Sequence, residues 1–396
     1  MSRMNYLDKL LDGVAVEWVN LGAITKIKTG QAVSKEIISK NPGEFPVINS
    51  GREPLGFINQ WNTDQNPIGI TSRGAGVGSV TWQEGKYFRG NLNYSVTIND
   101  LNSLEIRYLY HLLLSKQLEI QSLCTFDGIP ALNASNLKDL KIPIPCPENS
   151  EKSLEIQAEI VRILDAMTSH TAELTAELTA ELTLRKKQYN YYRDKLLSFE
   201  DGEVEWKKLG EIAEYSKTRI EFNELTKDNH VSVDSLLQNR GGKSPSNHLP
   251  NSGNLTEFVI NDILIGNIRP YLKKIWQSDR VGGTNGDVLV IRRKTEEIDA
   301  RFLFQVLADD KFFEYDMRHS KGAKMPRGDK KMIMDYPIPI PSLERQAEIA
   351  AILDKFDTLT HSITEGLPRE IELRQKQYEY YRDALLSFPK PDNINE

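Results

Sequence analysis

The chain has 396 residues, of which 39% are apolar and 27% charged, an ordinary globular composition at a length that suits roughly two to four domains. Its two cysteines, Cys124 and Cys146, are too few for a disulfide framework or a zinc site and fit a reducing compartment. No apolar run approaches a membrane span, and the first residues lack a signal-peptide core, so we expect a cytoplasmic protein without a membrane partner.

The formal net charge of −6 argues at first against a partner rich in phosphate, but the charge is unevenly spread. Residues 240–331 contain 17 Lys and Arg against 12 Asp and Glu, and residues 26–141 contain 12 against 10. Residues 151–203 contain 7 against 11. Because a local basic face matters more for phosphate binding than the chain total, nucleic acid is still a candidate partner.

The N-terminal part of the chain predicts short strands followed by a helix. Segments rich in β-branched residues and bounded by Gly, Asn or Pro are typical of strands. They lie at 45–49, 67–71, 78–82 and 94–98. Apolar residues at helical spacing predict a helix from about 104 to 123, and a Pro-rich strand follows at 141–145.

Residues 156–199 predict one long amphipathic helix, because apolar residues recur there at steps of three and four. The tetrapeptide TAEL occurs three times in succession from Thr171 to Leu182, a period close to the helical 3.6. A helix of 44 residues would span roughly 66 Å, which is too long to be buried in one small domain. Its apolar face therefore needs a second long helix or an outside partner.

The next part of the chain has the same layout as the first with little residue identity. Strands are predicted at 258–260, 263–266, 274–276 and 287–291, and a helix from about 299 to 317. A Pro-Ile-Pro-Ile-Pro segment at 337–341 matches the segment that precedes the first long helix.

Residues 345–388 repeat residues 156–199 at a constant offset of 189, with 24 identical positions in 44, so the molecule is a tandem duplication. Gly366 and Pro368 predict a break in the second helix alone. Residues 6–13 resemble the end of the first helix and the residues just after it, which predicts that the chain ends meet in space. Two such copies are most simply related by a twofold axis, so we expect the two long helices to be antiparallel.

No motif indicates catalysis. Gly74–Ser79 lacks the last glycine of a dinucleotide loop, so we interpret it as a Gly-rich turn next to Arg73. Gly241–Ser244 lacks the first glycine of a P-loop, so we interpret it as a flexible basic loop near DNA. The six histidines show no metal-binding spacing, and His230, His248 and His319 are expected at the surface or in structural roles. The sequence also lacks the Asn-Pro-Pro-aromatic and Asp-Pro-Pro-Tyr runs of adenine methyltransferases.

Basic and amide side chains in both globular parts are candidates for contact with DNA, because Arg, Lys and Asn can bind phosphates and base edges. An ordinary solvated surface is the alternative interpretation. In the first part the candidates are Lys26, Lys28, Arg52, Arg73, Lys86, Arg89, Asn91 and Asn93. In the second part they are Arg240, Lys243, Arg269, Tyr271, Lys273, Lys274, Arg280, Asn285, Lys321, Lys324, Arg327 and Lys330.

The run QYxYYRD in each long helix is richer in aromatic and charged residues than a coiled-coil seam requires, so we predict that it contacts other subunits. Its candidate residues are Gln188, Tyr189, Tyr191, Tyr192 and Arg193 in the first helix and Gln377, Tyr378, Tyr380, Tyr381 and Arg382 in the second.

The duplicated helices, the Pro-Ile-Pro segment before each, the LExQAEI…ILD motif and the QYxYYRDxLLSF endings resemble the specificity subunit of type I restriction-modification enzymes. The TAEL tract resembles the type IC branch. The resemblance covers nearly the whole chain, although the globular parts match in layout only. It implies an α+β fold with two similar mixed α/β target-recognition domains separated by two long antiparallel helices.

The resemblance also implies a domain order. It predicts recognition domains at 1–147 and 200–341, conserved helices at 148–199 and 342–390, and a loose tail at 391–396. It further implies a subunit without an active site or cofactor of its own. Its partners would be double-stranded DNA, two modification subunits that use S-adenosylmethionine to methylate adenine N6, and restriction subunits that require ATP and Mg²⁺.

Two other functions are weighed against this one. A structural adaptor with two protein-binding domains explains the helices and the acidic total, but it does not explain why both globular parts are basic. An enzyme is disfavoured because the expected motifs are missing. Salt-dependent DNA binding would separate a DNA-binding subunit from an adaptor.

Overall fold

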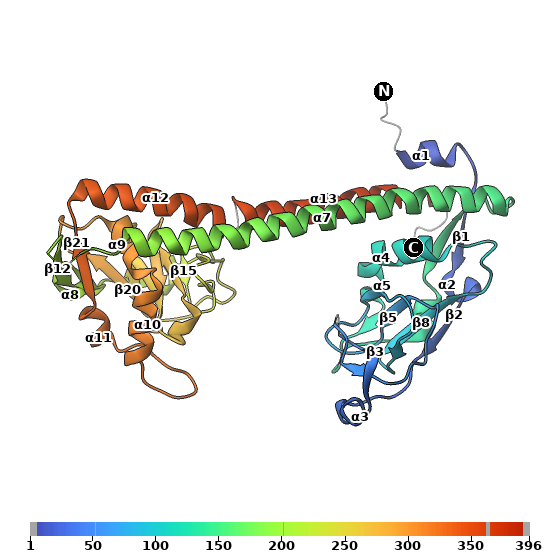
Figure 1. The fold of residues 1–396 in the computed structure, drawn as a ribbon, viewed down its shortest axis with the longest axis horizontal. Helices are drawn as coiled ribbons and strands as arrows, with labels where there is room; N and C mark the ends of the chain where they lie inside the picture. The colour runs from blue at the N-terminus through green and yellow to red at the C-terminus, as the bar shows by residue number, and fades with distance from the viewer. Residues whose placement is uncertain (1–5, 52, 201, 362–364, 391–396) are drawn as a thin grey trace. The chain divides into compact units, whose positions relative to one another are not determined.

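The computed structural model describes residues 6–51, 53–200, 202–361 and 365–390, and the chain divides into two compact units (Figure 1). Unit 1 comprises Met1–Glu173 and Gln375–Glu396, and unit 2 comprises Leu174–Arg374. Each unit thus contains one globular part together with a piece of each long helix. The predicted limits of the recognition domains remain predictions, and the predicted loose tail at 391–396 lies outside the described residues.

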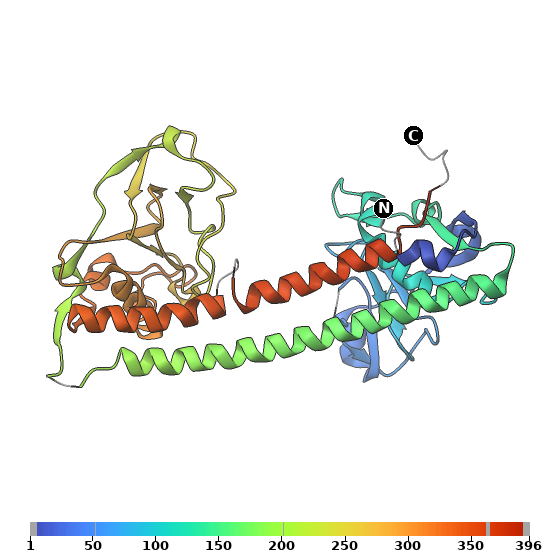
Figure 2. The same cartoon turned by 90° about the horizontal axis from the view of Figure 1, so that it is seen from above.

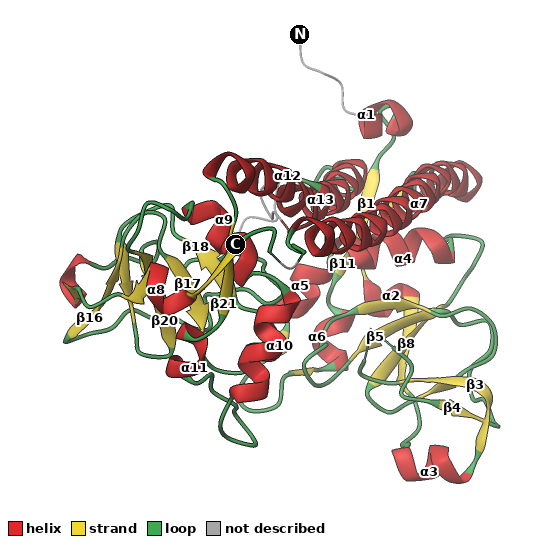
Figure 3. Cartoon of the chain, turned by 60° about the vertical axis from the view of Figure 1, so that its left-hand side comes forward, coloured by secondary structure: helices red, strands yellow, loops and turns green. Residues whose placement is uncertain are grey.

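The globular part of unit 1 contains a four-stranded sheet of order β2-β8-β5-β6, a three-stranded sheet of order β4-β3-β7, and the pairs β1-β11 and β10-β9. The strands are β1 (Val16–Asn20), β2 (Thr25–Thr29), β3 (Pro42–Ile48), β4 (Phe57–Ile58), β5 (Ile68–Thr71), β6 (Val80–Trp82), β7 (Phe88–Arg89), β8 (Asn93–Ile98), β9 (Cys124–Thr125), β10 (Ala131–Leu132) and β11 (Lys141–Pro145). The helices are α1 (Tyr6–Leu11), α2 (Leu21–Ile24), α3 (Lys35–Lys40), α4 (Ile106–Ser115), α5 (Gln117–Ser122) and α6 (Ala134–Lys138). Helix α4 lies on the side of the long helices, and α3 at the far end of the unit (Figures 1 and 3).

Unit 2 contains sheets of order β13-β20-β17-β18 and β14-β16-β19-β15 and the pair β12-β21. The strands are β12 (Glu205–Lys208), β13 (Ala213–Tyr215), β14 (Arg219–Glu221), β15 (His230–Val231), β16 (Asn254–Phe258), β17 (Ile263–Gly266), β18 (Ile275–Gln277), β19 (Gly282–Thr284), β20 (Val288–Arg293) and β21 (Pro337–Ile340). The helices of its globular part are α8 (Leu209–Ile212), η1 (Phe222–Glu224), η2 (Pro270–Leu272), α9 (Ala300–Leu307), α10 (Asp310–His319) and α11 (Lys330–Met334).

The first long helix is confirmed as α7 (Ser150–Leu196), a single element of 47 residues. The second is interrupted, as predicted, and consists of α12 (Leu343–His361) and α13 (Leu367–Leu385). Gly366 has a φ of +82°, and a Cβ at this position would lie 2.5 Å from the carbonyl oxygen of Thr358. The break therefore requires glycine, since an L side chain would be strained there and would collide with the end of α12.

In unit 2, α12 and the C-terminal part of α7 lie side by side and run in opposite directions, as expected (Figure 2). Their contact is aromatic, because Phe356 stacks on Tyr189 and Tyr192 with ring centroids 5.9 and 5.4 Å away. In unit 1, α13 contacts the N-terminal part of α7, and Thr168 Oγ1 donates a hydrogen bond to the Tyr378 hydroxyl at 3.0 Å.

The two ends of the described chain meet in unit 1, which confirms the expectation drawn from residues 6–13. Leu7 and Leu11 of α1 belong to the same buried core as Leu385, Leu386 and Phe388. The indole nitrogen of Trp18 donates to the carbonyl oxygen of Pro389 at 2.8 Å. Burial of apolar side chains from both ends in one core is what holds them together.

Each globular part is fastened to a long helix by a buried glutamine from the repeated QAEI motif. In unit 1, the Gln157 amide accepts from the backbone N–H of Glu105 at 2.9 Å and donates to the carbonyl of Ser103 at 3.0 Å. In unit 2, Gln346 accepts from the N–H of Asp299 at 2.7 Å and donates to the carbonyl of Glu297 at 2.9 Å. These bonds satisfy backbone groups just before α4 and α9, where helix N-termini leave donors unpaired.

A carboxylate further along each helix strengthens the attachment. Asp165 accepts from the Arg107 guanidinium at 2.9 Å and contacts His111 at 2.8 Å. Asp354, at the matching repeat position, accepts from Arg301 and Gln305, both at 2.7 Å. Because the same glutamine and aspartate contacts occur in both units, the duplication includes the contacts between each globular part and its long helix.

Two predicted helices are each divided, which corrects the sequence analysis. The segment 104–123 forms α4 and α5 with Lys116 between them, and the segment 299–317 forms α9 and α10. The second division has a clear cause, because the Asp309 side chain accepts from the N–H of Lys311 and so caps a new helix. Apolar periodicity does not reveal such a break, since both helices of a pair present the same apolar face.

Candidate nucleic-acid interface

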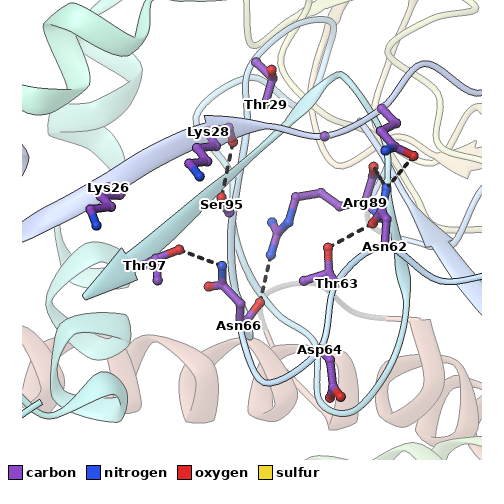
Figure 4. A pocket seen from close by; sticks show the side chains of 12 residues that line it. Lys26, Lys28, Thr29, Asn62, Thr63, Asp64, Asn66, Arg89, Ser95 and Thr97 are labelled. Atoms are coloured by element: carbon purple, nitrogen blue, oxygen red, sulfur yellow. Dashed lines mark hydrogen bonds between the residues drawn. The ribbon is translucent and has the colours of Figure 1, made fainter. Parts of the chain in front are cut away.

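A polar pocket of about 360 Å³ opens beside β2 in unit 1 (Figure 4). Lys26 and Lys28 alternate with Ile27 along β2, so both point to one face of the sheet and reach the pocket. The segment 62–66 and strand β8 supply amide and hydroxyl groups. The lining residues are Lys26, Lys28, Thr29, Gly30, Gln31, Asn62, Thr63, Asp64, Asn66, Arg89, Ser95 and Thr97. Two exposed ammonium groups beside amide donors can bind an anionic oxygen.

Arg89 lies at the floor of this pocket and is only 2% exposed. Its guanidinium donates to the backbone oxygens of Asn66 and Tyr94 at 2.8 and 3.0 Å and contacts the side chains of Asn93 and Tyr87. Burial lowers the pKa of Arg89 and raises the pKa of Tyr87 to about 12. Arg89 therefore lines the pocket as a buried group that Asn93 helps to hold, and the burial of both residues corrects the expectation that they belong to the exposed surface.

The other predicted residues of the first part are exposed at separate places. Arg73 lies on the turn after β5 and Asn91 on the turn before β8. The Lys86 ammonium lies over the ring of Trp61, 4.7 Å from its centroid. Arg52 lies outside the described residues.

In unit 2, four of the predicted residues are exposed without an ion pair to another described residue, namely Arg269, Tyr271, Lys324 and Lys330. Lys330 and the exposed Asn285 line a second pocket of about 720 Å³. His230 also lines this pocket, and its Nδ1 is 2.9 Å from the Ser246 hydroxyl, which agrees with a structural role.

The remaining predicted cations of unit 2 have intramolecular partners. Arg240 and Lys273 pair with Asp310, Arg280 with Asp279, Lys321 with Asp329 and Arg327 with Asp287, while Lys243 and Lys274 donate to the backbone oxygens of Asp228 and Val233. Lys274 is 8% exposed, and so is the Arg240 side chain. These two side chains are therefore buried, as is that of Arg89, and partners inside the unit satisfy their charges.

The aromatic runs of the long helices divide into buried and exposed residues. Tyr189, Arg193 and Tyr378 are buried, and Arg193 Nη1 donates to the carbonyl of Ala308 at 3.2 Å. These three therefore attach the helices to their own units, which corrects the expectation that they face another subunit. Tyr191, Tyr380 and Tyr381 are exposed, as is Gln377, while Gln188, Tyr192 and Arg382 are partly exposed.

The attachment residues Gln157, Gln346, Asp165 and Asp354 were not among the predicted site residues. Their signal was present, since all four stand at identical positions of the repeat. Within the described residues, no group of three or more His, Cys, Asp or Glu side chains is arranged to hold a metal ion. None of the described helices is both long and apolar enough to cross a membrane.

Comparison with known proteins gives a consistent result. The family described as "Type I restriction modification DNA specificity domain" matches residues 14–184 and 202–373. The chain is 36% identical to the type I restriction enzyme EcoR124I/EcoR124II specificity subunit of Escherichia coli, with 100% of both chains covered. It is 31% identical to the EcoprrI specificity subunit of the same organism, with 92% of this chain and 93% of the relative covered.

A solved structure of similar fold belongs to a study of complex assembly and conformational transition in a type I restriction-modification system. The similarity has a TM-score of 0.61 at 13% identity and covers 94% of this chain and 97% of the other. At that identity the likeness concerns the fold alone.

Proposed function

Because this chain belongs to the family of type I restriction-modification specificity subunits, we propose that it brings a modification complex to a DNA target read in two separate parts. One observation carries the proposal. Two globular parts with unlike surfaces are mounted on repeated helices by the same glutamine and aspartate contacts. Repeated helices that carry globular parts with different surfaces suit a protein that recognises two different DNA sequences.

In this proposal each globular part reads one half of an asymmetric target. Lys26 and Lys28 at the first pocket and Arg269, Lys324 and Lys330 in unit 2 contact phosphates or base edges, because none of these cations forms an ion pair with another described residue. The exposed Tyr191, Tyr380 and Tyr381 contact the modification subunits, since large exposed aromatic side chains on a helix favour a protein interface.

The chain itself has no catalytic role in this proposal. The modification subunits bind S-adenosylmethionine and methylate adenine N6, and restriction subunits add ATP- and Mg²⁺-dependent cleavage. A DNA-directed role of this kind places the chain in the cytoplasm.

Genome-wide mapping of N6-methyladenine tests the proposal. Cells that express the chain with its modification subunit are compared with cells that lack the chain. The expected result is a chain-dependent motif of two short defined halves around a fixed undefined spacer. A stable complex that gives no chain-dependent motif would contradict the proposal and favour a structural adaptor.

Salt dependence tests the assigned cations. Replacing Lys26 and Lys28 together with Gln should weaken target binding by the purified complex and reduce the slope of log affinity against log salt by about 2, since each phosphate contact contributes about 0.9. Lys152→Gln, in the exposed first turn of α7, is the matched control and should leave the slope unchanged. An unchanged slope in the double variant would remove these two lysines from the interface.

A further inference from the structure

Each unit carries a small hairpin of the same construction. In unit 1, Thr125 pairs with Ala131 and encloses a loop of five residues, 126–130. In unit 2, Lys321 pairs with Arg327 and encloses a loop of five residues, 322–326. The fifth residue of each loop is a proline, Pro130 or Pro326. The two loops share no other identical position, so the common geometry is not a consequence of common sequence.

The end of each loop is tied to the neighbouring strand connection in the same way. The carbonyl oxygen of Pro130 accepts from the N–H of Gly74 at 2.9 Å, and that of Pro326 accepts from Arg269 at 2.8 Å. The next residue of each hairpin forms an antiparallel bridge, Ala131 with Arg73 and Arg327 with Ile268. These contacts hold both hairpins rigidly against the rest of their units.

The residue before each proline is large, apolar and exposed. Ile129 is 71% exposed and Met325 is 45% exposed. A residue before proline is confined to extended backbone conformations, so both side chains are presented in a fixed direction. A single exposed apolar side chain is ordinary on a protein surface. Its recurrence at the same position of two rigid, hydrogen-bonded hairpins, one in each unit, suggests contact with a partner.

The charged groups around the tips favour nucleic acid as that partner. Lys324 lies beside Met325, and Arg269 and Arg73 lie on the segments to which the two hairpins are tied; among described residues none of the three has an ion pair. Loop 126–130 also contains Asp127, so the cationic surroundings are stronger in unit 2. Basic side chains on either side of an exposed apolar side chain complement duplex DNA, in which phosphates lie on either side of the stacked base pairs.

We propose that Ile129 and Met325 are wedges that insert between base pairs of bound duplex DNA, one in each half of the target. Proteins that open a base step use side chains of this kind, including Ile and Met, and the opened step bends or unstacks the duplex. The wedges would loosen the duplex near bases that a partner must reach. This inference rests on the proposed function, because it requires that the chain bind DNA.

Fluorescence of 2-aminopurine tests the wedges, since this base brightens when it is unstacked. The complex with modification subunits is bound to its mapped target, and the probe is placed in turn at each position other than the methylated adenines. Fluorescence should rise at one step in each half. Ile129→Ser should abolish the rise in one half only, and Met325→Ser in the other half only.

Matched variants control for folding and for loss of apolar surface. Leu101→Ser and Leu343→Ser remove comparably exposed leucines, 66% and 53% accessible, away from the hairpins, and both signals should persist. Ile129→Leu and Met325→Leu keep an apolar tip and should retain both signals. Each Ser variant of the wedges should bind the intact target more weakly, on the order of tenfold. Binding should recover on a duplex with an abasic site at the opened step.

The outcomes separate the two proposals. Sequence-specific binding without a fluorescence rise at any step, or with signals unaffected by the Ser variants, overturns the wedges and leaves the proposed function intact. A wild-type complex that shows no sequence-specific, salt-dependent binding overturns both.

Discussion

Asp316 is a buried carboxylate in unit 2 that receives no hydrogen bond from the described residues. It is 1% exposed, and neither of its side-chain oxygens has a partner among them. The side-chain oxygen of Asn267 likewise has no hydrogen-bond partner among the described residues. Both residues lie close to Gly328, where a Cβ would be 2.3 Å from Asp316 Oδ1 and 2.8 Å from Asn267 Oδ1. Burial raises the pKa of Asp316 from 3.8 to about 6, against the opposing effect of His319.

The raised pKa predicts a pH-dependent stability of unit 2. Between pH 3.8 and about 6, the folded state holds a proton on Asp316 that the unfolded state has lost, so the contribution of this group to stability is greatest below this range and falls as pH rises through it. Asp316→Asn should therefore stabilise the unit at pH 8 by up to about 3 kcal/mol, and near pH 4 it should give no gain. Urea unfolding of the full chain, followed by hydrogen exchange in peptides from 262–334, measures this difference.

The matched control is Glu177→Gln, since the Glu177 side chain is exposed in the same unit. It should leave the urea midpoint unchanged at both pH values. A destabilised Asp316→Asn variant at pH 8 would show that the carboxylate has a stabilising partner in solution.

The attachment glutamines allow a second test at single residues. Gln346→Ala leaves the N–H of Asp299 and the carbonyl of Glu297 unpaired at a part-buried site, which should cost about 1–3 kcal/mol. Hydrogen exchange should accelerate at the start of α9 while α4 in the other unit is unchanged. Gln157→Ala should accelerate exchange at the start of α4 and leave α9 unchanged. Gln60→Ala, which changes an exposed side chain, should accelerate exchange at neither helix. Equal acceleration in both units would contradict independent attachment.

Among the elements, the break between α12 and α13 has the clearest single cause. Gly366→Ala should cost about 1–2 kcal/mol from the left-handed backbone alone, and its Cβ would also meet the Thr358 carbonyl. Hydrogen exchange at the end of α12 and the first turn of α13 should rise. Gly286→Ala, where a Cβ meets nothing within 4 Å, is the control and should change exchange little.

The sequence predicted the elements that depend on local pattern. The length of α7 and the break near Gly366 follow from periodicity and from glycine and proline, and both were confirmed. Strand β1 was missed, because its partner β11 is distant in the chain and a Val-Glu-Trp-Val segment is ambiguous by itself. The divisions at Lys116 and Asp309 were missed because the apolar period continues across them.

The candidate site was less predictable for a related reason. Lys26 and Lys28 were predicted from a cluster of basic and amide residues, whereas strand β2, whose alternation brings both to one pocket, was not predicted. The burial of Arg89 depends on Tyr87 and on the backbone of Asn66 and Tyr94, and no local pattern shows that these groups converge. A cation in a strand therefore looks exposed in the sequence even where the fold encloses it.

For the molecule as a whole, the TAEL tract predicts a relation between helix length and target spacing. Removing one TAEL unit shortens α7 by four residues, about 6 Å, which corresponds to at most about two base pairs. We expect the deletion to shorten the unread spacer by one or two base pairs while both half-site sequences stay the same. Methylation mapping of the deletion mutant measures this, and an unchanged spacer would show that α7 does not set it.

Unit 2 is built from one continuous stretch, whereas unit 1 needs residues from both sides of that stretch. During synthesis, domains fold as their residues emerge from the ribosome. Unit 2 is therefore complete while unit 1 still lacks Leu385, Leu386 and Phe388, which fill its core. The N-terminal unit is thus the last to mature, and its unfinished apolar surface is the part of the nascent chain that depends longest on chaperones and is longest open to proteases.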